Sequence, residues 1–149
     1  MQIRTTEWLD RKGFLFLEQR RSGLLLAQRG IPNLITDAGR ALFANLGIGT
    51  DTAPSHIAIG TGTTAPTEAD TAMETEVDRQ AAVVSRVTIS VTNDGSQFLY
   101  TFTIAATYDI SEGGLLNAAA AGILACHQIF TALPCLSGDT LKATWRIRN

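Results

Sequence analysis

Apolar and polar residues alternate along two neighbouring stretches of the chain, 83–92 and 98–105. A period of two is typical of strands that bury one face. The residues between the two stretches, Asn93-Asp94-Gly95, suit a tight turn because Asn, Asp and Gly tolerate a positive φ. The pattern therefore predicts a β-hairpin.

Shorter apolar runs predict further strands. Residues 13–28 hold two such runs on either side of Arg21-Ser22-Gly23, which indicates a hairpin near the N-terminus. Residues 139–148 alternate again, with Trp145 on one face and Arg146 on the other. With the strands expected over 55–60, 114–117 and 122–131, the chain holds about eight short strands.

One stretch has the signals of a helix. Thr36 is a suitable N-cap, and Asp37 suits the positive end of the helix dipole. Apolar residues follow over 41–46, and Gly47 is a suitable C-terminal stop. We expect one short helix of about three turns over roughly residues 36–46.

These elements predict a mainly β protein. Short strands without alternating helices are typical of an antiparallel β-sandwich or jelly roll. A chain of 149 residues is expected to be a single domain that forms a core without disulfides or metals. Within it, we expect residues 1–32 to form an N-terminal hairpin arm and residues 33–149 to form the β-sandwich domain.

Charge changes the picture in two ways. Only 17% of the residues are charged, against about 25% in a typical soluble domain, so the surface is either neutral or covered by a partner. The charges are also segregated. Residues 1–40 carry seven Lys and Arg against four Asp and Glu, whereas residues 41–80 carry six Asp and Glu against one Arg. This segregation indicates pairing within the chain, complementarity between copies, or simply a solvated mixture of charges.

Motifs for cofactors and metals are weak. Gly60-Thr61-Gly62 lacks the lysine of a phosphate-binding loop, so a tight loop after a strand is the better interpretation. The two histidines, His56 and His127, do not match a zinc motif. Cys126 and Cys135 match neither a zinc motif nor a disulfide framework, and we expect Cys126 to be a small core residue. We therefore expect no metal and no cofactor.

An acidic group lies in the middle of the chain. It lacks the spacing of a calcium-binding loop, which favours a solvated loop or an acidic interface over weak calcium binding. Thr71 and Glu74 have capping-box spacing, which predicts a short helix or turn over 71–77. The acidic group consists of Glu68, Asp70, Glu74, Glu76 and Asp78.

Catalytic constellations are missing as well. No nucleophile elbow is present, and the adjacent Cys126 and His127 would point to opposite faces of a strand. We expect the chain not to be an enzyme. If distant residues did assemble a hidden site, His56, Asp109 and Glu112 would be the first candidates.

The nature of the partner and the compartment follow from composition. An isoelectric point near 5.6 gives no global support for a direct nucleic-acid role. No apolar run approaches the ~18 residues of a membrane span, and no signal-peptide stretch is evident. We expect a soluble protein of a cytosol-like compartment, with no membrane and no small-molecule substrate.

Several motifs recur in an order that resembles a family of small structural proteins of tailed-bacteriophage virions. The motifs are Asn33-Leu34-Ile35-Thr36-Asp37-Ala38-Gly39-Arg40, residues 56–66, Asp70-Thr71-Ala72-Met73, residues 110–118 and residues 138–145. The resemblance covers roughly residues 33–149. It implies a β-rich virion subunit without catalytic residues, which is assembled in the cytoplasm of a bacterial host.

The leading functional hypothesis is a decoration or cement protein that binds the outside of a capsid. The alternatives are a tail, collar or fibre component and, less favoured, a receptor- or glycan-binding β-sandwich. The expected partners are copies of the chain itself, as a dimer or trimer, and a major capsid or tail protein. The candidate interface residues, with filling of a local core as their other interpretation, are Trp8, Phe14, Phe16, Arg20 and Arg21.

Overall fold

The structure, a computed structural model, describes residues 12–148, which form nine strands and one helix. All the strand pairs are antiparallel. The mainly β fold class with one short helix is therefore confirmed. The elements are β1 (Lys12–Arg21), β2 (Leu24–Ile35), α1 (Asp37–Gly47), β3 (His56–Gly60), β4 (Glu76–Ala81), β5 (Val83–Val87), β6 (Gly95–Thr103), β7 (Tyr108–Leu116), β8 (Leu124–Cys135) and β9 (Thr140–Arg148).

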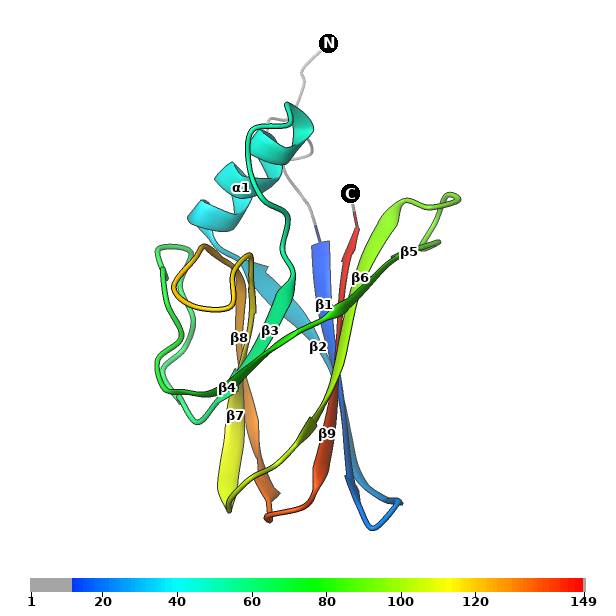
Figure 1. The fold of residues 1–149 in the computed structure, drawn as a ribbon, viewed down its shortest axis with the longest axis vertical. Coiled ribbons are helices and arrows are strands. Elements are labelled where there is room, and N and C mark those ends of the chain that lie inside the picture. Colours follow the sequence, from blue (N-terminus) through cyan, green and yellow to red (C-terminus); the bar gives the residue numbers. More distant parts are fainter. Residues whose placement is uncertain (1–11, 149) are drawn as a thin grey trace.

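The strands form one continuous sheet in the order β4-β3-β7-β8-β2-β1-β9-β6-β5. The two outer strands, β4 and β5, follow one another in the chain with only Ala82 between them. The chain thus crosses from one end of the sheet to the other at this point, and the sheet is nearly closed (Figure 1). The strand order shows one curled sheet. The sandwich or jelly-roll arrangement that the sequence suggested is not confirmed.

The N-terminal hairpin is part of the main sheet. Its turn lies at Ser22 and Gly23, which both have a positive φ. β1 pairs with β2 on one side and with β9 on the other, and its Leu15 and Leu17 are buried in the core. Residues 12–32, which the sequence suggested as an arm, are therefore integral to the fold.

The second hairpin is shorter on one side than the alternation suggested. β5 ends at Val87, and residues 88–94 form a loop before β6. The Asp94 carboxylate accepts hydrogen bonds from the backbone N–H groups of Ile89, Ser90 and Val91. A side chain that binds the backbone in this way replaces the ladder that would continue the strand.

Helix α1 begins where the sequence predicts. The Thr36 hydroxyl accepts the N–H of Gly39 and donates to the carbonyl of Leu124, which fastens the helix start to β8. Leu42 and Phe43 are buried against the sheet. The helix is eleven residues long, and among the described residues no helix is long and apolar enough to cross a membrane.

The core fills the inside of the curled sheet. Its largest fully buried side chains include Trp145 and Phe102, from neighbouring strands β9 and β6. Cys126 lies in this core as a free thiol, and burial raises its pKa to about 12. Cys135 is also free and buried.

Candidate interaction surface

Strand β1 places its apolar side chains on both faces of the sheet. Leu15 and Leu17 point into the core, so Phe14 and Phe16 point outward by the alternation of a strand. Phe14 is 42% exposed and Phe16 is 41% exposed. Their rings stack with a centroid distance of 6.4 Å. Two partly exposed aromatic rings thus lie side by side on a regular strand, which makes this face a candidate for binding.

The pairing register extends this surface across β9. Phe16 pairs with Thr144 and Phe14 pairs with Arg146, so these side chains share the outer face. We call this face the β1–β9 surface. It consists of Lys12, Phe14, Phe16, Glu18, Arg20, Lys142, Thr144, Arg146 and Arg148.

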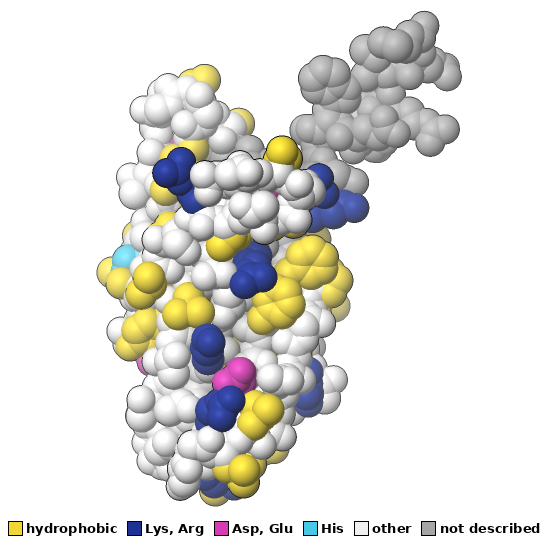
Figure 2. Space-filling model, turned by 90° about the vertical axis from the view of Figure 1, so that its right-hand side faces the viewer, with side chains coloured by type: hydrophobic (Ala, Val, Ile, Leu, Met, Phe, Trp, Pro, Cys, Tyr) yellow, Lys and Arg dark blue, Asp and Glu magenta, His cyan; other side chains and the backbone are white. Residues whose placement is uncertain are grey.

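The β1–β9 surface is strongly basic. It carries five cationic side chains and one carboxylate, that of Glu18. A hydrogen bond of 2.6 Å from Arg20 lowers the pKa of Glu18, so this carboxylate is engaged within the surface. Figure 2 shows the basic and apolar side chains interspersed on this side of the molecule, with little acidic surface.

Two of the arginines are held in place by neighbours. The Arg146 guanidinium lies over the Phe16 ring, 5.6 Å from its centroid, and donates to the Gln97 side chain at 2.8 Å. Arg148 donates to the Ser90 hydroxyl at 2.8 Å. Side chains that are already ordered lose less entropy on binding, which favours their use in an interface.

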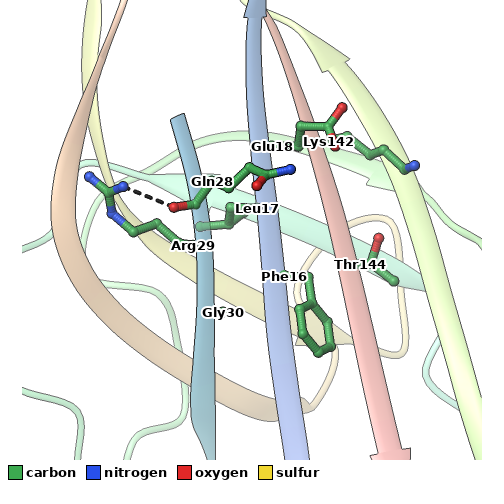
Figure 3. A pocket seen from close by; sticks show the side chains of 8 residues that line it. All are labelled: Phe16, Leu17, Glu18, Gln28, Arg29, Gly30, Lys142 and Thr144. Atoms are coloured by element: carbon green, nitrogen blue, oxygen red, sulfur yellow. Dashed lines mark hydrogen bonds between the residues drawn. The ribbon is translucent and has the colours of Figure 1, made fainter. Parts of the chain in front are cut away.

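A shallow hollow of about 370 Å³ lies beside Phe16. Gly30 on β2 and Thr144 on β9 lie on either side of the Phe16 ring (Figure 3). Neither has a large side chain, so the surface is lower on both sides of the ring. Glu18 and Lys142 lie at the other end of the hollow. The surface is therefore ridged, with the Phe16 ring as a projecting feature.

The described candidate interface residues from the sequence lie in two different places. Phe14, Phe16 and Arg20 come together on the β1–β9 surface. Arg21 lies at the end of β1, where its guanidinium donates two hydrogen bonds to the buried Asp139 carboxylate, at 2.8 and 2.9 Å. Trp8 lies outside the described residues.

The cations of β9 belong to this surface but have no link to the phenylalanines in the sequence pattern. The alternation in residues 139–148 did place Lys142, Arg146 and Arg148 on one face. Only the pairing of β9 with β1, from opposite ends of the described chain, brings them beside the phenylalanines. Strand pairing of this kind is not readable from local pattern.

A second cluster lies in the interior, around His127. Its Nε2 atom is 2.8 Å from the Glu112 carboxylate, and its Nδ1 atom is 2.7 Å from the Asp70 carboxylate. A neutral imidazole carries one N–H, so the two contacts require a second proton, on the ring or on a carboxylate. Glu112 also accepts the backbone N–H groups of Gly62, Glu74 and Thr75.

This cluster acts as a clamp for the loop over residues 61–75. The fully buried Glu112 carboxylate is occupied by backbone donors from both ends of the loop. The Glu74 carboxylate binds the backbone N–H groups of Thr63 and Thr64, and so does not complete the capping box with Thr71. The helix or turn suggested over 71–77 is consequently replaced by bends that lead into β4.

The three candidates for a hidden enzyme site do not converge. His56 pairs with Leu116, at the opposite end of β7 from Asp109. Glu112 lies between them, with its side chain in the clamp. Within residues 12–148, no group of three or more His, Cys, Asp or Glu side chains is arranged to hold a metal ion.

The acidic group from the sequence is gathered on the loop 61–75 and on β4. Glu68 forms an ion pair with Arg40 at 2.8 Å, and Glu76 forms one with Arg79 at 2.7 Å. The five carboxylates of the group thus have two guanidinium partners, the exposed Arg40 and the largely buried Arg79. This side of the molecule retains excess negative charge.

We found no match to this chain among protein-family models, curated proteins or solved structures. The surface and the clamp are therefore interpreted from their own geometry. They define a small β protein with a basic aromatic surface and an internally clamped acidic loop.

Proposed function

We propose that the chain is a structural subunit that acts by binding other proteins, as a component of a tailed-bacteriophage virion. Its most specific form is a cement or decoration protein on the outside of the capsid, and a tail, collar or fibre position is the alternative. The observation that carries the proposal is the exposed pair Phe14 and Phe16 among ordered cations on a regular sheet. The biological setting is proposed from the resemblance of the motif order to virion structural proteins.

The side chains of the β1–β9 surface suit protein binding. Aromatic residues and arginine carry much of the binding energy in protein interfaces. Fully burying a Phe side chain is worth roughly 1.5–3 kcal/mol, and Phe14 and Phe16 have about two fifths of their surface left to bury. Together with Arg146, they form a compact anchor.

Such a subunit would work by mass action. A protein that binds the assembled lattice and not its free subunits stabilises the lattice by its own binding free energy. The proposal assigns no catalytic step, because the Glu112 carboxylate and His127 ring are occupied in holding the loop 61–75.

The test is binding to phage particles that were produced without the protein. Gold-labelled wild-type protein is expected to decorate the heads, and the double variant Phe14→Ser and Phe16→Ser is expected to bind at least about tenfold more weakly, since a loss of ~1.4 kcal/mol has this effect. Electron microscopy and co-sedimentation measure the two effects.

The matched control is the double variant Ile48→Ser and Val91→Ser. It removes two exposed apolar side chains outside the β1–β9 surface and is expected to bind like wild type. Label on tails would select the tail alternative, and no label on any part of the particle would contradict the virion proposal. Equal loss in both double variants would contradict the role of the β1–β9 surface.

A further inference from the structure

We infer that the β1–β9 surface binds the acidic side of a second copy of the chain, so that copies join through two different surfaces. The inference rests on the proposed function and adds the identity of one partner. By the acidic side we mean the loop 61–75 with β4, which carries Glu68, Asp70, Glu74, Glu76 and Asp78.

The two surfaces lie on opposite sides of the molecule. In the sheet order, β4 is separated from β1 and β9 by strands in both directions around the curl. In Figure 1 the loop before β4 is on the left, whereas β1 and β9 lie to the right. The charge is therefore arranged as a basic side and an acidic side, and neighbouring copies can use both at once.

The basic side is unsuited to binding itself. Five cations, of which Arg20 pairs with Glu18 and Arg148 with Asp94, would face the same five cations in a symmetric pair, and like charges juxtaposed in an interface are costly. A contact between the basic side of one copy and the acidic side of the next avoids this cost. Such a contact is heterologous, and it closes into a ring when the rotation between copies allows closure.

The two sides also have complementary shapes. On the acidic side, a hollow of about 250 Å³ is lined by Thr64, Ala65, Asp70, Ala72, Glu74 and His127. We call the Asp70 and Glu74 carboxylates its acidic rim; Asp70 also contacts His127, and Glu74 accepts the backbone N–H groups of Thr63 and Thr64. On the basic side, the projecting Phe16 ring is covered by the Arg146 guanidinium. An aromatic ring entering the hollow would bring its guanidinium against the acidic rim, where arginine and carboxylate pair well.

A charge-swap experiment tests this contact in the full chain. One variant carries Lys142→Glu and Arg146→Glu, and a second carries Glu68→Lys and Glu76→Lys. Glu68 forms a surface ion pair with Arg40, which contributes little to folding, whereas Glu76 pairs with the largely buried Arg79, so the fold of this variant needs a separate check. Circular dichroism and thermal melting of each variant check that it folds.

Sedimentation velocity gives the readout. Wild type is expected to self-associate at low salt, with an association constant about tenfold lower at 500 mM than at 50 mM NaCl, because surface charge pairs are screened. Each double variant alone is expected to remain monomeric. Their equimolar mixture is expected to associate, since the unaltered acidic side of the first variant can bind the unaltered β1–β9 surface of the second.

Arg86→Glu is the matched control for Arg146→Glu. Both are exposed strand arginines. Arg86 on β5 pairs with Ser96 on β6, and Ser96 pairs with the buried Ile147 on β9, so Arg86 is not on the outer face that carries Arg146. It is expected to leave self-association unchanged. Monomeric wild type at low salt, or folded variants that associate separately but not on mixing, would overturn the inference.

The particle-binding assay separates this inference from the proposed function. If wild type is monomeric but still needs Phe14 and Phe16 to bind particles, the proposed function stands and the self-contact is wrong. If the variants associate only when mixed but the wild type does not bind particles, the self-contact stands and the proposed function is wrong.

Discussion

At Gly39, helix propensity and tertiary packing favour different residues. It lies in the first turn of α1, where an alanine would ordinarily favour the helix. In the fold, a Cβ at this position would clash with the carbonyl oxygen of Ala125 on β8. The helix approaches the strand as closely as it does because this residue has no side chain.

We therefore expect Gly39→Ala to destabilise the protein by about 1–3 kcal/mol, the usual cost of forcing extra volume into a packed region. Gly47→Ala is the control, because nothing lies within 4 Å of a Cβ at that position. It is expected to change stability between zero and a gain of about 1 kcal/mol. Urea denaturation followed by circular dichroism measures both, and equal stabilities for the two variants would contradict this account.

The clamp around Glu112 is a feature of elements rather than of one residue. A strand, β7, supplies the carboxylate, its neighbour β8 supplies His127, and the loop 61–75 supplies the backbone donors. The chain before β4 is thereby held without a helix or a ladder of its own. A loop with few regular hydrogen bonds owes its order to such side-chain contacts.

Replacement of the carboxylate by an amide, Glu112→Gln, is expected to loosen this loop. The amide removes the charge and turns a donor towards backbone N–H groups, and each buried group left unpaired costs about 1–3 kcal/mol. Hydrogen exchange of the Gly62 and Thr75 amides should then be at least about tenfold faster than in wild type.

Asp109→Asn is the control for this substitution, because Asp109 is an exposed carboxylate on the same strand. Exchange at Gly62 and Thr75 should not change in this variant. Unchanged exchange in Glu112→Gln would show that the loop is held by other contacts.

The stability of the molecule as a whole should respond to acid through its engaged carboxylates. Hydrogen bonds from the Arg21 guanidinium hold the pKa of Asp139 well below its usual range, and backbone N–H groups starting with that of Ile89 do the same for Asp94. Hydrogen bonds also lower the pKa of Glu68 and Glu74. A carboxyl with a lowered folded-state pKa stabilises the fold above its unfolded pKa, and loses this effect as the pH falls through its folded value.

We expect the melting temperature to be nearly constant from pH 7 to pH 5 and to fall below about pH 4, near the unfolded pKa of Asp and Glu. Asp139→Asn should melt below wild type at pH 7, with a smaller gap at pH 2.5. Calorimetry at one low protein concentration measures this, because self-association would add a concentration-dependent contribution. A gap that widens in acid would contradict the role given to Asp139.

Much of the element content follows from local pattern alone. The helix start at Thr36, the turn at Ser22-Gly23 and the alternation of β9 each depend on residues close together in sequence, and each is found in the structure. The predictions from local pattern were wrong where a side chain binds backbone N–H groups and replaces regular structure. The Asp94 carboxylate binds the backbone N–H of Ile89, so β5 is shorter than predicted. The Glu74 and Glu112 carboxylates bind backbone N–H groups of the loop 61–75, where a helix or turn was predicted before β4.

By itself, the sequence determined that the protein is mainly β, that it has one short helix, and that its charge is segregated along the chain. These properties depend on periodicity, capping and composition, which are local or additive. The tertiary structure alone decided that β1 is a central strand beside β9, and that His127 meets both Asp70 and Glu112. Pairing between distant strands depends on how the whole core packs, so the basic aromatic surface became visible only in the folded chain.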